Sequence, residues 1–313
     1  MIVRERPSGL GLFLIVRGSV LRRIWPTLLL NILLASLVTY SHGDLYKLKI
    51  TMTAIPFTMI GLPLAIFLGF RNSAAYDRYW EARKLWGTLV LRSRNLARQC
   101  QSLIILPGVA HASLGLDDVR VRMTLRAIAY VYALRDLLRG NERSADYQPF
   151  LTANDFASLA GASNRPDRLM LAMGHDLRSC LEQGQIAPCL ATAVDDTLSA
   201  MVGAAASCER IKGTPIPFSY TLLLHRTAYM YCFLLPFGLV DTVSFMTPVV
   251  VGIVAYTFFG LDALGDELEE PFGTSANDLA LDAMCRGIEI NLRQALGDSN
   301  IPPPLQPVEY FLM

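Results

Sequence analysis

The stretch that decides the fold is ITMTAIPFTMIGLPLAIFLGF, residues 50–70. It contains no Asp, Glu, Lys or Arg over its 21 residues. An α-helix needs about 20 predominantly apolar residues to cross the hydrocarbon core of a bilayer. We therefore predict that residues 50–70 form a helix that spans a membrane.

Three further stretches have the same character. Residues 24–43 and 242–261 also lack Asp, Glu, Lys and Arg, and residues 217–240 are interrupted only by His225 and Arg226. A buried helix of a large soluble protein is the alternative for each stretch, but several such runs in one chain are rare in soluble proteins. The pattern predicts four transmembrane helices.

The composition agrees with a membrane protein and excludes several other classes. Hydrophobic residues make up 52% of the chain and charged residues 18%, whereas soluble domains carry about 25% charged residues. A net charge of +1 lacks the basic excess of a nucleic-acid-binding protein. The six cysteines form no C-x-x-C pair, and the four histidines lack the spacing of metal ligands. We expect reduced thiols, and no catalytic residue, metal or cofactor.

The distribution of positive charge predicts the orientation. Five Arg residues lie within residues 1–23, seven Lys or Arg lie within residues 71–98, and none lies between the last two predicted spans. Loops rich in Lys and Arg stay in the cytosol. We expect a multi-pass protein of the cell inner membrane with both termini and residues 71–216 in the cytosol. Residues 1–23 are expected to form an amphipathic segment.

The segments outside the predicted spans indicate helices rather than strands. Residues 71–216 repeat apolar side chains at helical spacing, with Gly and Pro between the repeats. Residues 262–313 are expected to form a cytosolic helix followed by an extended, proline-rich tail. The predicted fold class is an all-α membrane protein with a large helical cytosolic region, assembled around a central pore.

Four motifs resemble the bestrophin family of ion channels, most closely its bacterial branch. They are IFLGFRNSA at 66–74, EARKLWG at 81–87, PIPFSYT at 215–221 and ELEEPFGT at 267–274. They occur in the family's order on the same membrane plan. The resemblance extends from about residue 18 to residue 296. It implies a homopentamer that conducts monovalent ions, in animal members chloride, through one central pore.

The resemblance places the narrow neck of this pore at Leu62, Ile66 and Phe70. Their i, i+4, i+8 spacing puts them on one face of a helix. A ring of such faces makes an apolar collar, which can gate by dewetting. Packing between helices or contact with lipid is the alternative for each of these side chains.

The resemblance also implies a second constriction at the cytosolic mouth of the pore, at Leu177 or, alternatively, Cys180.

A further feature is an acidic run directly after the last span. It could be a solvated face, a partner for the basic residues after residue 70, or a vestibule that attracts cations. Such a vestibule favours cations, so we expect cation conduction, with chloride conduction as the alternative. Its carboxylates are Asp262, Asp266, Glu267, Glu269 and Glu270.

Two expectations limit the family resemblance. Animal bestrophins bind calcium through an acidic run after Pro-Phe-Gly, but residues 274–278 here read TSAND and retain only Asp278. Calcium needs six to eight oxygen ligands, so we do not expect activation by calcium.

The alternative functions are a secondary transporter, for which the sequence shows no repeated halves, and a non-conducting scaffold.

Overall fold

The computed structural model describes residues 1–4, 15, 18–41, 44–45, 48–49, 52–106, 115–141 and 144–313. Contacts divide the chain into two compact units. Unit 1 comprises residues 1–3, 81–214 and 272–313, and unit 2 comprises residues 4–80 and 215–271. The long helix α2 (Ile55–Leu103) contributes its first part to unit 2 and the remainder to unit 1.

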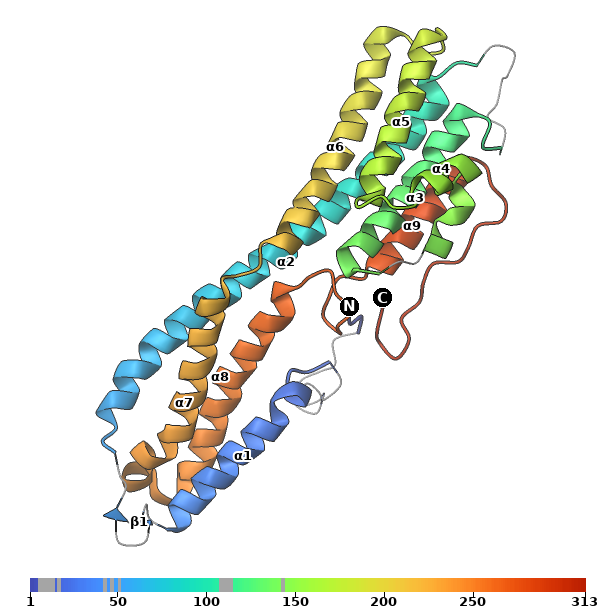
Figure 1. Ribbon diagram of the computed structural model, residues 1–313. Helices are drawn as coiled ribbons and strands as arrows, with labels where there is room; N and C mark the ends of the chain where they lie inside the picture. The colour runs from blue at the N-terminus through green and yellow to red at the C-terminus, as the bar shows by residue number, and fades with distance from the viewer. Residues whose placement is uncertain are drawn as a thin grey trace. The chain divides into compact units, whose positions relative to one another are not determined.

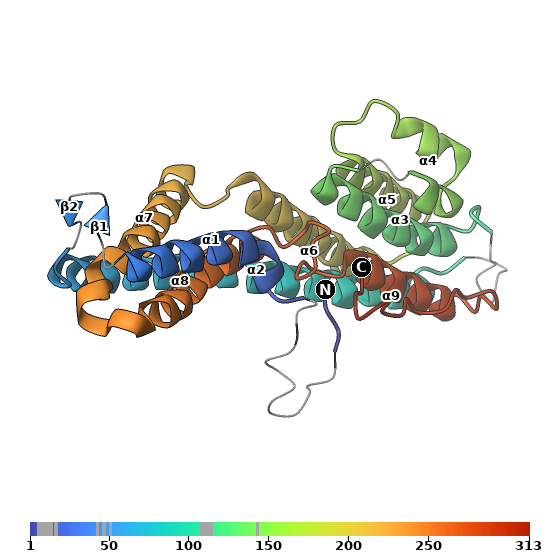
Figure 2. The same ribbon diagram turned by 90° about the horizontal axis from the view of Figure 1, so that it is seen from below.

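Unit 2 is built from α1 (Leu21–Tyr40), the first part of α2, α7 (Phe218–Val243) and α8 (Thr247–Glu269). The 3-10 turn η4 (Ser244–Met246) joins α7 to α8. Figures 1 and 2 show α1 lying along α8, and α7 packs against both helices. These helices are long and apolar enough to cross a membrane.

Each predicted span overlaps one of these helices, but the limits differ. Helix α2 continues to Leu103, beyond the predicted end at residue 70, and α8 spans Thr247–Glu269 rather than residues 242–261. Helix α1 begins at Leu21, three residues before the predicted span. Helix α2 begins at Ile55, because Pro56 is tolerated in the first turn, where its missing N–H has no helical partner. The strands β1 (Asp44–Leu45) and β2 (Leu48–Lys49) lie between α1 and α2 in the chain and pair with each other. They form the one sheet of the described residues.

Small residues allow the helices of unit 2 to pack closely. One cluster joins Ile24 of α1, Cys232 of α7, and Ala255 and Phe259 of α8. Between membrane helices the driving force is close packing rather than exclusion of water, so small side chains at contacts are favourable. The packing agrees with the membrane location predicted from the uncharged stretches.

Unit 1 is helical and is organised around α3 (Val119–Arg139), most of whose side chains are buried. The other helices are α4 (Ala153–Ser158), α5 (Arg165–Glu182), α6 (Pro188–Gly213) and α9 (Leu281–Ala295), with short 3-10 turns η2 (Ser144–Asp146) and η3 (Gln148–Phe150). Helix α3 packs against α5, α6 and α9. Helix α6 also meets the length and composition of a membrane span, but it packs within this unit.

The two ends of the chain meet in unit 1. The Met1 ammonium group donates to the Leu312 carbonyl at 2.6 Å, and Ile2 pairs with Phe311 in an isolated β-bridge. The N and C labels accordingly lie close together in both ribbon views (Figures 1 and 2). The amphipathic segment predicted for residues 1–23 falls mostly on residues 5–14, 16 and 17, which lie outside the described residues.

The contact between α2 and α7 generates a test of the packing in unit 2. A Cβ atom added at Gly238 would lie 2.3 Å from Cε2 of Phe57, whose ring is buried. We expect Gly238→Ala to lower the free energy of unfolding by about 1–3 kcal/mol, the usual cost of overpacking. Gly260→Ala is the matched control, because nothing lies within 4 Å of its added Cβ. Equal thermal unfolding of the two variants in detergent would contradict this packing.

Candidate pore-lining site

The predicted neck residues lie on the open face of α2. Leu62, Ile66 and Phe70 are 67%, 47% and 63% exposed. The opposite face is buried, with Leu64 and Leu68 packed against Leu224 and Ala228 of α7. The three positions predicted for the neck thus form an apolar face that unit 2 leaves largely exposed.

An aromatic chain supports the end of this face. The Phe67 ring meets the Phe70 ring edge to face at 6.3 Å and the Tyr220 ring at 6.5 Å. The Tyr220 hydroxyl donates to the Phe67 carbonyl at 3.1 Å. Edge-to-face aromatic pairs are favourable in this range, so α7 helps to orient the Phe70 side chain.

A buried ion pair lies at Arg71, the residue after Phe70 of the predicted neck. Arg71 is 1% exposed, and its Nη1 donates to Asp262 Oδ1 of α8 at 2.7 Å. Asp262 is also buried, and its other oxygen lies 2.6 Å from Nδ1 of His225 on α7. A buried charge is costly unless it is paired and hydrogen-bonded. This cluster therefore fixes α2, α7 and α8 relative to one another within unit 2.

Two further members of the acidic run, Asp266 and Glu269, also have partners. Asp266 accepts from Arg71 and from Arg23 of α1, the latter at 2.6 Å. Glu269 accepts from the backbone N–H of Ile216 at 3.0 Å. Of the three interpretations of the run, these contacts favour the one in which carboxylates pair with basic residues.

That pairing withdraws Asp262 and Asp266 from the argument for cation preference. A vestibule selects for cations only if its carboxylates face the ion path without a fixed counter-charge. Asp262 is buried and both it and Asp266 bind Arg71, whereas Glu270 is exposed and Glu267 is partly exposed. The sequence left pairing with the basic residues after residue 70 as one alternative, but it could not identify the partners, because they lie about 190 residues apart.

The predicted second constriction does not fit the packing of α5. Leu177 is 5% exposed and Cys180 is 1% exposed, and both belong to the helix face turned into unit 1. Burial raises the pKa of Cys180 to about 11. A side chain at the edge of an aperture must face the ion path, whereas within one chain Leu177 and Cys180 face into unit 1. The second constriction stays a prediction.

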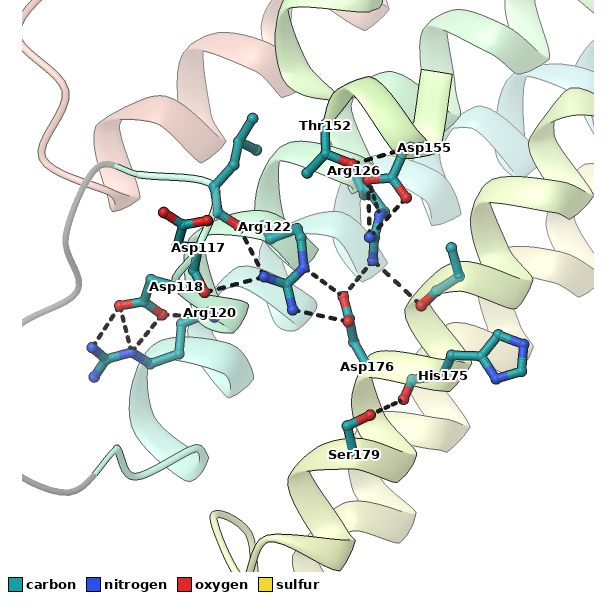
Figure 3. Close-up of polar contacts among 12 residues, drawn as sticks. Asp117, Asp118, Arg120, Arg122, Arg126, Thr152, Asp155, His175, Asp176 and Ser179 are labelled. Carbon is teal, nitrogen blue, oxygen red and sulfur yellow. Dashed lines mark hydrogen bonds and ion pairs between the residues drawn. The ribbon is translucent and has the colours of Figure 1, made fainter. Parts of the chain in front are cut away.

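Asp176, next to Leu177, belongs to an ion-pair cluster that Figure 3 shows. Arg122 of α3 donates to Asp176 at 3.0 Å, and Arg126 donates both to Asp176 and, at 2.9 Å, to Asp155 of α4. The hydrogen bonds to Asp176 raise the pKa of the Arg122 guanidinium despite its partial burial. The i, i+4 spacing of the two arginines was the signal that could have predicted a shared partner.

Comparison with known proteins identifies the family. The model for the family described as Bacterial/Fungal Bestrophin protein matches residues 1–294. The voltage-dependent anion channel-forming protein mll4386 of Mesorhizobium japonicum is 45% identical over 315 residues, which cover 99% of this chain and 96% of that protein. YneE of Escherichia coli K12, which carries the same descriptive name, is 40% identical over 312 residues, or 99% of each chain.

A solved structure extends the similarity to three dimensions. The crystal structure of a bacterial bestrophin homologue from Klebsiella pneumoniae matches with a TM-score of 0.80 and 39% sequence identity. The match covers 86% of this chain and 97% of that chain.

The apolar helices of unit 2 and the helical unit 1 define an α-helical membrane protein. The chain belongs to the bacterial and fungal bestrophin family. The resemblance predicted from the four sequence motifs is thereby confirmed, and so is the all-α membrane fold. The relatives are named for channel formation rather than for catalysis.

The buried ion pair generates a stability test. Arg71→Ala leaves Asp262 buried without its guanidinium partner, a change that costs about 3–5 kcal/mol in comparable buried pairs. We expect a strongly lowered thermal unfolding temperature in detergent. The control is Arg178→Ala, because its i, i+4 pair with Glu182 is exposed and surface pairs contribute little. An Arg71→Ala protein as stable as this control would contradict the structural role of the pair.

Proposed function

We propose that this chain forms a homopentameric channel that conducts monovalent ions through one central pore. The observation that carries the proposal is the open apolar face of α2 at Leu62, Ile66 and Phe70, opposite the face packed on α7. The membership of the bestrophin family and the names of its relatives, which describe channel formation, support it.

The neck would act as a hydrophobic gate. Five copies of α2 arranged about an axis bring five copies of each neck residue to the same level, through head-to-tail contacts that close into a ring. A narrow apolar tube loses water, and an ion that enters it loses its hydration shell. The exposure of all three side chains in one chain fits this role, since the ring would be completed by other copies.

The membrane placement follows from the charge bias. We propose that the protein lies in the inner membrane with unit 1 and both termini in the cytosol. Seven Lys or Arg follow the pore-lining stretch within residues 71–98, and the segment between α7 and α8 has none. The meeting of the two chain ends in unit 1 is consistent with termini on the same side.

The names of the relatives and the ion pairs of the structure bear on whether the channel conducts anions or cations. The relatives are named as anion channel-forming proteins, which supports anions. The neck carries no charge, and two of the carboxylates that favoured cations, Asp262 and Asp266, are paired with Arg71. The reversal potential of the purified protein under a salt gradient measures the sign directly, and it is independent of whether the neck is the gate.

Tracer flux into liposomes distinguishes the proposed channel from the alternatives. A channel gives flux that rises linearly with ion concentration over a wide range. A secondary transporter gives saturating, coupled flux, and a scaffold gives none. Saturation or absence of flux would overturn the proposed function.

The neck generates a prediction with a built-in contrast. Ile66→Ala should raise single-channel conductance or open probability, because the ring widens and dewetting weakens. Folding should change little, since Ile66 is 47% exposed within its own chain. Leu64→Ala is the matched control: Leu64 is 3% exposed, so its truncation should destabilise by about 2–5 kcal/mol without a gain in conductance. Loss of assembly without increased current in Ile66→Ala would remove Ile66 from the pore.

Calcium should not be required for opening. The only carboxylate in the turn after Pro-Phe-Gly, Asp278, is buried and accepts a hydrogen bond from the Ser275 N–H at 2.7 Å. It therefore caps its own turn. We expect liposome flux to be the same with a calcium chelator as with micromolar calcium. A chelator-sensitive flux that calcium restores would show that other ligands replace the missing acidic run.

A further inference from the structure

An apolar groove runs between α1 and α8, which lie side by side in unit 2 (Figures 1 and 2). Its volume is 440 Å³, within the range of about 300–1,000 Å³ that is typical of ligand sites. Tyr256 carries the one polar group among the main lining side chains. These are Leu28, Ile32, Val249, Gly252, Ile253 and Tyr256.

Gly252 of α8 lines this groove next to Ile32 of α1. A Cβ atom added at Gly252 would lie 3.3 Å from Cδ1 of Ile32, so even a methyl group would take up part of the space. Val249 and Ile253 form the outer wall and are 52% and 63% exposed. The groove is therefore open toward whatever surrounds the membrane-spanning helices.

The shape of the groove fits an extended chain. The stretch from Val249 to Tyr256 covers about 10 Å of the α8 axis at the α-helical rise per residue. One leaflet of the bilayer hydrocarbon is about 15 Å thick, half of the full core. A lipid acyl chain in the groove would be in contact with protein over much of its length.

The end of α1 supplies the chemistry of a headgroup site. Trp25 lies one helical turn before Leu28 and is 55% exposed, and Trp side chains favour the membrane–water interface. Arg22 lies one turn further and is exposed. Arg23 pairs with Asp266, whereas Arg22 makes no ion pair within the described part of the chain. A cation beside an interfacial Trp complements a lipid phosphate.

We propose that the groove between α1 and α8 binds one acyl chain of an anionic phospholipid, with the phosphate beside Arg22 and the interfacial part of the lipid beside Trp25. Arg22 lies about 9 Å along the α1 axis from Leu28, at the α-helical rise per residue. Its positive charge favours a lipid over a second copy of the chain. A basic residue near the membrane surface favours an anionic lipid by about fivefold.

Native mass spectrometry of the full-length, delipidated protein tests the proposal. The probes are dioleoyl phosphatidylglycerol and dioleoyl phosphatidylcholine, added separately and in competition. The unmodified protein should bind phosphatidylglycerol about fivefold better than phosphatidylcholine. Arg22→Gln should abolish this preference and keep the binding of both lipids, whereas Gly252→Leu should lower the occupancy of both severalfold.

The matched control is Thr257→Leu. Thr257→Leu adds an apolar side chain at an exposed position of α8 that does not line the groove, and it should leave lipid occupancy unchanged. Unchanged preference in Arg22→Gln would overturn the headgroup site. If Gly252→Leu does not fold, Arg22→Gln still decides, because the Arg22 side chain is exposed. Loss of the oligomer in Gly252→Leu, without selective lipid binding by the unmodified protein, would assign the groove to a contact between copies and overturn the proposal.

Discussion

The buried charge of Arg71 is the constraint on which the membrane unit depends. An arginine with 1% exposure needs anionic partners, and the chain supplies them from α8, with His225 of α7 completing the cluster at Asp262. Because Arg71 directly follows Phe70, this pairing also sets the rotation of α2. The open face of α2 is thus determined by where its one buried cation must point.

The spans could be predicted from the sequence because their signal is local. A run such as residues 50–70 needs no partner to be recognised as apolar. The partners of the acidic run could not be predicted in the same way. Asp262 and Asp266 meet Arg71 through packing, and a single sequence contains no measure of that distance.

The constriction predicted on α5 shows a different limit of the sequence. Leu169, Met173, Leu177 and Cys180 recur at i, i+4, i+8 and i+11, a helical periodicity that indicates one buried face. The family resemblance implies instead that Leu177 or Cys180 lines an aperture. The neck residues share the same i, i+4 spacing but lie on an exposed face. Periodicity therefore groups side chains reliably, and only the surrounding packing shows what the group faces.

The meeting of the chain ends has a consequence for biosynthesis. Unit 1 takes residues from the beginning, middle and end of the chain, and unit 2 consists of two excursions, residues 4–80 and 215–271, that leave it and return. Val3 donates to the Tyr310 carbonyl and Leu312 to the Met1 carbonyl, both at 2.9 Å. Residues 310–312 must therefore leave the ribosome before residues 1–3 find their partners. Both helical hairpins can enter the membrane during translation, whereas closure of unit 1 must wait for the synthesis of this late segment.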